Sequence, residues 1–369
     1  MRVLHFLPDG FGGHGGIAQF NKDLLTAVCA SPLVREVVAV PRVMPFDPGD
    51  LPPKLHYDVS AISGKGRYAA RALHYALRDR RFDLILCTHI NLQPMAALAR
   101  AVTGAPSVLF LHGIEAWQRP AKPLTALAAR RADWFAGVSR VTVGRFQAWA
   151  NVPGERCLVL PCCVDLGRFA PAAPRPETVE RYGLAGTRPV LSLARLAGNE
   201  RSKGFDQVLA VLRAIVREAP DVVYVIAGGG NDRARLEQMA QSLGVADRVR
   251  FTGYVKDADK VDLYRAARAF VLAGRGEGFG IVLLEAMACG IPVVASTLDG
   301  SYEAIGNGAM GIAVDPNDGD ALSRAILAAL QRPVGVRPAG LDHFSFTAFS
   351  ERVHNLLEQT MAARQRAPR

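Results

Sequence analysis

The sequence predicts an α/β protein of two Rossmann-like domains that face each other across a cleft, each built on a mostly parallel sheet. Short apolar runs, typical of buried strands, alternate with amphipathic stretches, typical of helices, along almost the whole chain. The alternation weakens at 161–176, where four prolines mark a linker. The length of 369 residues also suits two hydrophobic cores better than one.

In the first domain, residues 1–170, apolar runs predict strands and the longer segments between them predict helices. The strands are expected at 2–7, 36–41, 83–87, 107–111 and 133–138, and the helices at 17–30, 65–80, 92–102 and 122–131. A proline-rich loop is expected after the second strand, up to about residue 60.

The second domain, residues 171–343, shows the same alternation. Strands are expected at 189–194, 222–227, 249–251, 269–273 and 292–296, and helices at 205–218 and 232–243. A third helix ends at Cys289, because Gly290 and Pro292 stop a helix and allow a strand to restart. Residues 344–369 are expected to form a C-terminal helix that packs on the first domain.

A glycine-rich turn at 274–280 joins the strand at 269–273 to this third helix. Glu277 in the turn lies at the carboxyl end of a strand, where open α/β sheets bind ligands. Glu285 follows inside the helix, among apolar neighbours that argue against a solvated position. The glycines let the backbone approach a ligand, and the helix start offers N–H groups to an anion. The turn therefore predicts a site with one carboxylate beside a sugar and one beside hydroxyl groups further along the same ligand.

The stretch 277–296 closely resembles the retaining glycosyltransferases of family 4, which have the GT-B fold, and the resemblance extends over 15–316. It implies that Glu277 contacts the donor sugar near its reacting end and that Glu285 holds the nucleoside ribose. It further implies that the residues between them line the donor site, namely Gly278, Phe279 and Gly280. Gly274 departs from the family, which usually has serine there, and is expected to leave a small gap beside the diphosphate.

Arg195 ends the first strand of the second domain, and Lys203 follows after a polar loop, just ahead of a helix. Two cations near a helix start can surround a diphosphate, and the chain lacks the Gly-Lys-Ser/Thr motif of P-loop ATPases. The resemblance implies that both cations grip the diphosphate and stabilise the leaving group. It also implies that Gly228 lines the donor pocket and that the backbone at Val255 reads the edge of the base.

The first domain contributes a second set of rim residues. Gly10, Gly12 and Gly15 match the dinucleotide fingerprint, but the second strand ends without the acidic residue that holds a ribose, so NAD is not expected. The resemblance implies instead that Gly15 and Gly16 bring N–H groups near the donor phosphates or the acceptor. It also places His112 near the transferred sugar, with Ser139 and Arg140 on the cleft floor; His89 is a second histidine candidate.

The net charge is +10, and the first 170 residues carry 20 Lys and Arg against 12 Asp and Glu. No signature of a nucleic-acid-binding motif accompanies this charge, so nucleic acid is not an expected partner. The six cysteines show no C-x-x-C spacing, which fits reduced thiols in a cytoplasm. No segment reaches 18 consecutive apolar residues, and the first residues suggest a strand, so neither a transmembrane helix nor a signal peptide is expected.

Basic residues gather in two groups of the first domain. The first group lies on or beside the helix at 65–80 and consists of Lys65, Arg67, Arg71, Arg78, Arg80 and Arg81. The second group accompanies Trp117 and Trp134 and consists of Arg119, Lys122, Arg130 and Arg131. Helical spacing puts three arginines of the first group on one face with His74 and Tyr75. Such a face is either solvated or rests on anionic headgroups. We predict reversible, salt-sensitive binding to the inner face of a membrane.

Two carboxylates, two cations and strand-end glycines suit a nucleoside diphosphate that carries a sugar. Because the cations can stabilise the departing diphosphate, neither a cofactor nor an obligatory metal is expected. The resemblance implies retaining transfer of a hexosyl unit from a UDP- or GDP-linked sugar to a hydroxyl of a lipid-linked or saccharide acceptor, in the assembly of surface polysaccharides. A sugar-nucleotide epimerase on the same fold and a non-catalytic sugar-nucleotide-binding protein stay open as alternatives.

Overall fold

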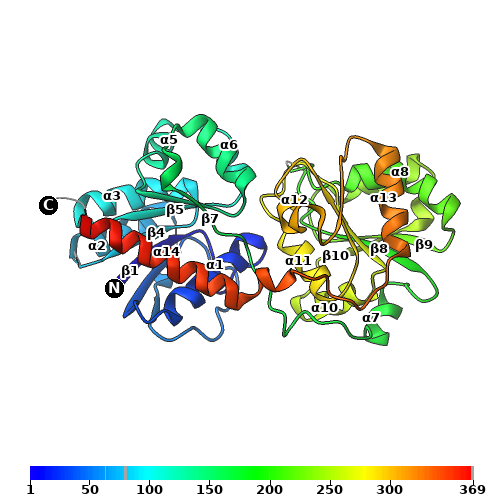
Figure 1. Ribbon diagram of the computed structural model, residues 1–369, viewed down its shortest axis with the longest axis horizontal. Helices are drawn as coiled ribbons and strands as arrows, with labels where there is room; N and C mark the ends of the chain where they lie inside the picture. Colours follow the sequence, from blue (N-terminus) through cyan, green and yellow to red (C-terminus); the bar gives the residue numbers. More distant parts are fainter. Residues whose placement is uncertain (63, 79–80, 199, 367–369) are drawn as a thin grey trace. The chain divides into compact units, whose positions relative to one another are not determined.

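The computed structural model describes residues 1–62, 64–78, 81–198 and 200–366, so Arg80 of the predicted basic helix lies outside the described residues. The chain divides into two compact units: Met1–Cys163 together with Phe346–Arg369, and Val164–Ser345. Each unit is a parallel sheet flanked by helices (Figure 1). The predicted pair of Rossmann-like domains is therefore confirmed.

The sheet of the first unit has seven parallel strands in the order β3-β2-β1-β4-β5-β6-β7. Its strands are β1 (Arg2–Leu7), β2 (Glu36–Pro41), β3 (Leu55–Tyr57), β4 (Leu84–Cys87), β5 (Ser107–Leu111), β6 (Trp134–Gly137) and β7 (Cys157–Val159). The order reverses between β1 and β4, and in such sheets ligands bind at the carboxyl ends of the strands next to the reversal. The segments that follow these strands therefore carry the candidate residues of this unit.

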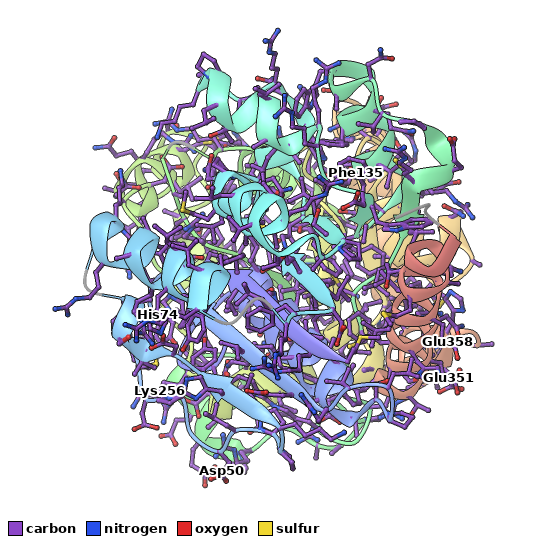
Figure 2. The ribbon with its side chains drawn as sticks, turned by 90° about the vertical axis from the view of Figure 1, so that its left-hand side faces the viewer. Asp50, His74, Phe135, Lys256, Glu351 and Glu358 are labelled. Carbon is purple, nitrogen blue, oxygen red and sulfur yellow. The ribbon has the colours of Figure 1, made fainter. Side chains whose placement is uncertain are left out.

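Seven α-helices belong to the described part of the first unit: α1 (Gly16–Ala30), α2 (Lys65–Arg78), α3 (Gln93–Thr103), α4 (Ile114–Trp117), α5 (Pro123–Ala129), α6 (Arg140–Ala150) and α14 (Phe346–Arg366). The last of them packs beside α1 (Figure 1). The rings of Phe20 and Phe349 meet edge to face with centroids 5.8 Å apart. Figure 2 shows Glu351 and Glu358 on the outer side of α14, as expected for a helix with one buried face.

The sheet of the second unit has six parallel strands in the order β10-β9-β8-β11-β12-β13. Its strands are β8 (Arg188–Leu193), β9 (Val222–Ala227), β10 (Val249–Gly253), β11 (Ala269–Leu272), β12 (Val293–Ser296) and β13 (Ile312–Val314). Its α-helices are α7 (Pro176–Arg181), α8 (Phe205–Glu218), α9 (Arg233–Ser242), α10 (Asp257–Ala266), α11 (Ile281–Ala288), α12 (Ser301–Ala304) and α13 (Gly319–Gln331). Here the strand order reverses between β8 and β11.

The structure contains elements that the sequence did not predict. Three are the edge strands β3, β7 and β13, each of three residues, which is too short for a pattern of buried positions to stand out. The helices α7 and α10 are mostly polar, so no apolar periodicity marks them. The helices α6 and α13 were also not predicted. Among the described residues, no helix is both long and apolar enough to cross a bilayer.

Candidate active site

Lys203 and Glu277 form an ion pair at the carboxyl ends of β8 and β11. The Nζ atom of Lys203 lies 2.9 Å from Oε2 of Glu277. Lys203 comes just before α8, and Glu277 lies in the turn between β11 and α11. Because these two strands are neighbours in a parallel sheet, their following loops meet at one edge. The structure thus brings together the two residues that the sequence assigned to the leaving group and the sugar.

Two glycines allow these loops to touch backbone to backbone. The N–H of Arg275 donates to the carbonyl oxygen of Ser202 at 2.8 Å. A Cβ atom on Gly274 would lie 2.2 Å from that same oxygen, and one on Gly204 would lie 2.5 Å from the backbone of Ala273. The expected gap at Gly274 is therefore wrong, because the Ser202 carbonyl occupies the space that a serine side chain would need.

The ion pair is largely buried, with 16% of the Lys203 side chain and 22% of the Glu277 side chain exposed. Burial opposes the charge on Lys203, but the carboxylates of Glu277, Glu200 and Asp299 outweigh this effect and raise its pKa. Lys203 therefore stays protonated at neutral pH. A fixed ammonium group at a strand end can stabilise the negative charge that develops on a departing phosphate.

Asp299 supports the Glu277 turn, and the sequence analysis missed it. Its Oδ2 atom accepts the N–H of Glu277 at 2.9 Å, and its Oδ1 atom accepts the N–H of Ser301 at 3.0 Å. The carbonyl of Glu277 in turn accepts the N–H of Gly300 at 2.9 Å. Burial raises the pKa of Asp299 to about 6. A signal was available, since Asp299 follows the predicted strand at 292–296, but no motif singled it out.

The pKa of Asp299 makes the stability of the turn depend on pH. Between about pH 4 and pH 6 the folded protein keeps the Asp299 proton that the unfolded chain has lost, because the ordinary pKa is 3.8. The contribution of this group to the free energy of unfolding should therefore fall as the pH rises, by up to about 3 kcal/mol. Urea denaturation of the protein and its Asp299→Asn variant between pH 4 and pH 7 measures the difference. A difference that does not change with pH would contradict this account.

Arg195 is placed differently from Lys203. Its side chain is 69% exposed and pairs with Glu200, whose two carboxylate oxygens each lie 2.7 Å from the same Arg195 nitrogen. The structure therefore does not bring Arg195 into the Lys203–Glu277 pair. The sequence analysis did not identify Glu200, which lies in the polar loop between the two cations and contributes negative charge near both.

Glu285 is only 3% exposed, on the buried side of α11. Its Oε1 atom lies 2.6 Å from Nζ of Lys260, and its Oε2 atom accepts the hydroxyl of Tyr264 at 2.7 Å. Both partners come from α10, a helix that the sequence did not predict. Each carboxylate oxygen has two lone pairs, so each keeps one acceptor position beyond these bonds. The arrangement fixes the carboxylate while leaving it able to accept a further hydroxyl.

The remaining predicted residues of this unit are mostly backbone positions. Gly228 follows β9 with φ of 136°, and a Cβ there would lie 1.9 Å from the Ala194 carbonyl oxygen. Gly280 precedes α11 with φ of 100°, and Gly278 in the same turn is buried. Phe279 is 2% exposed and packs on Phe344, so its side chain belongs to the core. Val255 is half-buried and follows β10.

In the first unit, His112 follows β5. Its Nε2 atom lies 2.9 Å from the carbonyl oxygen of Thr88, so this nitrogen carries the proton and Nδ1 is an acceptor. Burial lowers the pKa of His112 to about 4, which makes the ring neutral at physiological pH. Glu115 accepts the backbone N–H groups of His112 and Gly113 at 2.7 and 3.2 Å and so fixes the turn. His112 can therefore accept a hydroxyl group but not act as a cation.

The other candidates of this unit have local structural partners or lie in loops. His89 caps a short 3-10 helix, since its Nδ1 accepts the N–H of Asn91 at 3.1 Å. Ser139 is fully buried and caps α6 by accepting the N–H of Thr142 at 3.0 Å. Arg140 is the exposed first residue of α6. Gly15 precedes α1 with φ of 93°, and a Cβ on Gly15 or Gly16 would meet no atom within 4 Å.

Two stretches have the Asp-x-Asp spacing of a metal-binding motif: Asp257-Ala258-Asp259 at the start of α10 and Asp318-Gly319-Asp320 at the start of α13. Asp259 pairs with Arg175 at 3.1 Å and with Arg181 at 3.0 Å. Across the described residues, no three His, Cys, Asp or Glu side chains gather in a way that could hold a metal ion.

Both units of the chain are similar to known proteins. The model of Glycosyltransferase Family 4 matches residues 15–168, and that of Glycosyl transferases group 1 matches residues 176–338. A GDP-mannose-dependent alpha-(1-6)-phosphatidylinositol monomannoside mannosyltransferase of Mycolicibacterium smegmatis is 36% identical over 291 residues, covering 73% of this chain and 75% of that protein. The O-antigen chain mannosyltransferase B of Escherichia coli is 34% identical over 183 residues, 49% of this chain and 47% of that protein.

Solved structures show the same fold. Sucrose-phosphate synthase from Thermosynechococcus elongatus superposes with a TM-score of 0.79 at 21% identity, covering 98% of this chain and 99% of that one. Anabaena HepE in complex with UDP-glucose superposes with a TM-score of 0.74 at 19% identity, covering 97% and 100%. At such low identity the likeness establishes the two-domain GT-B fold and nothing finer.

Proposed function

Because this chain belongs to the group 1 glycosyltransferases of family 4, we propose that it transfers a mannosyl unit from GDP-mannose to a hydroxyl group of a lipid-linked acceptor, with retention of the anomeric configuration. That it is a nucleotide-sugar glycosyltransferase follows from its relatives. The Lys203–Glu277 pair carries the proposal for the site, since it sets a cation for a phosphate beside a carboxylate for a sugar. The choice of GDP-mannose is supported by the names of the mannosyltransferase relatives.

In the proposed reaction, Lys203 and Arg195 bind the diphosphate. The bond between C1 of the sugar and the phosphate oxygen breaks, and its electron pair stays on the diphosphate, where the two cations stabilise it. The acceptor hydroxyl attacks C1 from the same face and its proton passes to the departing phosphate oxygen. Glu277 holds the sugar near C1. The neutral ring of His112 can accept a hydroxyl group of a substrate through Nδ1. Glu285 accepts a ribose hydroxyl while Lys260 and Tyr264 hold its carboxylate in place.

The donor can be tested by heating the protein with GDP-mannose, UDP-glucose and ADP-glucose, each with and without EDTA. A ligand that binds only the folded state raises the apparent stability. We expect GDP-mannose to give the largest rise and EDTA to leave both the rise and turnover unchanged, because Lys203 and Arg195 supply the positive charge. A larger rise in apparent stability with UDP-glucose would show that UDP-glucose, and not GDP-mannose, is the donor. Strict dependence on a divalent ion would contradict the metal-free reaction.

The product distinguishes the proposed reaction from the alternatives. NMR of the product formed with a lipid-linked acceptor should show an α-linked mannose, the configuration of the donor. A sugar-nucleotide epimerase would consume GDP-mannose with no acceptor present. A non-catalytic binding protein would show the thermal shift without any turnover. A β-linked product would contradict the retaining assignment.

We further propose that the enzyme works on the cytoplasmic face of a membrane, where a lipid-linked acceptor is held. The predicted α2 surface is weaker support for this than the sequence suggested. Arg71, the central arginine of that face, lies 2.7 Å from Asp58, and the hydroxyl of Tyr75 donates to the same carboxylate at 2.9 Å. Figure 2 shows His74 on the same helix. The ion pair cancels one of the three charges that were expected to meet the headgroups.

A further inference from the structure

The helix α5 is built with its large apolar side chains facing outward. Leu124 is 67% exposed and Leu127 is 48% exposed, three residues apart and therefore on one face. The buried positions of this helix are the small residues Thr125, Ala126, Ala128 and Ala129. An amphipathic helix of a soluble protein normally buries its large apolar residues. The reversed pattern leaves both leucine side chains exposed on the same face of α5.

Basic residues surround these leucines. Arg119, Lys122, Arg130 and Arg131 are all exposed, and Ile114 adds a third exposed apolar side chain at 42%. The only acidic residue of the stretch 114–131 is Glu115, whose carboxylate accepts the N–H groups of His112 and Gly113. We call these seven residues the α5 surface: Ile114, Arg119, Lys122, Leu124, Leu127, Arg130 and Arg131. It combines apolar side chains with four positive charges.

A small cavity lies beside Leu127. Its volume is about 80 Å³, and it is lined by Arg119, Pro123, Ala126, Leu127, Arg130 and Trp149. Arg130 is held in place because its Nε donates to the Ala150 carbonyl oxygen at 2.7 Å. Trp149 is held likewise, through its Nε1 bond to the Ala116 carbonyl oxygen at 2.9 Å. The cavity therefore has an ordered apolar wall with two guanidinium groups at its side, which suits an anionic group attached to a hydrocarbon chain.

We propose that the α5 surface docks on an anionic phospholipid bilayer, with Leu124 and Leu127 among the acyl chains and the four basic residues on the headgroups. This inference rests on the proposed lipid-linked acceptor and names the part of the chain that reaches it. The α5 surface lies on the same unit as His112 and begins two residues after it in the sequence. A second copy of the chain fits this surface less well than a bilayer, because four positive charges would meet four positive charges.

The test is flotation of the purified protein with vesicles of phosphatidylcholine alone or mixed with phosphatidylglycerol. Binding is expected only with the anionic vesicles. The double variant Leu124→Ser/Leu127→Ser should lower binding at least about tenfold, because two leucine side chains no longer enter the acyl region. Replacing Arg119, Lys122 and Arg131 with Gln should lower it further and remove its dependence on salt.

Matched variants on α2 provide the control, since Leu73 and Leu77 are exposed there at 38% and 46%. The double variant Leu73→Ser/Leu77→Ser should bind vesicles as the unchanged protein does. Equal losses for both pairs, or no loss for the α5 pair, would overturn the assignment to α5. The thermal shift with GDP-mannose checks that each variant is folded and binds donor. If the unchanged protein shows the thermal shift with GDP-mannose but does not bind anionic vesicles, the proposed docking surface is wrong. The proposed reaction is then not affected.

Discussion

Replacing Glu277 with glutamine is expected to lower kcat by about 10²–10³-fold, the loss seen when one group that stabilises a transition state is removed. Donor affinity should stay the same or rise slightly. The glutamine oxygen can still accept a hydrogen bond from Lys203, which Glu277 contacts at 2.9 Å, but it no longer cancels the lysine charge that attracts the diphosphate. Turnover measurements and calorimetry with GDP-mannose separate the two effects.

Glu285→Gln is the matched control, because it makes the same chemical change, from carboxylate to amide, at the second glutamate of the stretch 277–296. This variant should weaken binding of GDP and guanosine alike, since Glu285 and its partners Lys260 and Tyr264 are assigned to the ribose and not to the phosphates. Near-normal turnover in Glu277→Gln, with Glu285→Gln also unaffected, would remove the catalytic assignment from this turn.

Replacing Lys203 with methionine should weaken binding of GDP by about 10- to 100-fold, the value of a hydrogen bond to a charged group, and barely change binding of guanosine. Methionine keeps the length and apolar character of the buried stem, so little of the local packing is lost. The change also leaves the Glu277 carboxylate without its cation and close to the incoming diphosphate. Calorimetry with the nucleotide and the nucleoside measures both affinities.

Arg195→Met gives the comparison for this result. Because Arg195 is 69% exposed and already paired with Glu200, its loss should cost less GDP affinity than the loss of Lys203. If guanosine binding falls as much as GDP binding in the Lys203 variant, the lysine supports the fold and not the phosphates. If Arg195→Met lowers the affinity for GDP more than Lys203→Met does, then burial does not decide which of the two cations binds the diphosphate more strongly.

The central strands and the Lys203–Glu277 pair could be predicted because both follow from strong local patterns. Apolar runs such as 222–227 mark strands that are buried on both faces. In parallel sheets the loops after neighbouring strands meet at one edge, so two charged residues in such loops are expected to lie close together. The edge strand β3 could not be predicted, because Leu55–Tyr57 has one partner strand and only one buried residue.

The partners of the site residues were harder to predict than the residues themselves. Lys260 and Tyr264 come from α10, which has a mostly polar sequence and no apolar stripe, so nothing in the sequence linked them to Glu285. Glu200 lies in a loop, where no periodicity constrains its direction. The close approach of the Ser202 carbonyl to Gly274 depends on the packing of two loops that are distant in sequence. Each of these contacts is set by tertiary structure.

The route of the chain has a consequence for biosynthesis. The second unit, Val164–Ser345, is one continuous segment inserted into the first, whose last helix α14 comes only after it. On a ribosome, the inserted unit is complete just before α14 is made, so it can fold while synthesis continues. Once residues 1–163 are made, roughly ten to forty seconds pass before α14 is complete, at the usual rates of translation. During that time α1 exposes the side of Phe20 that later packs on Phe349, and a chaperone that covers this surface would protect the nascent chain.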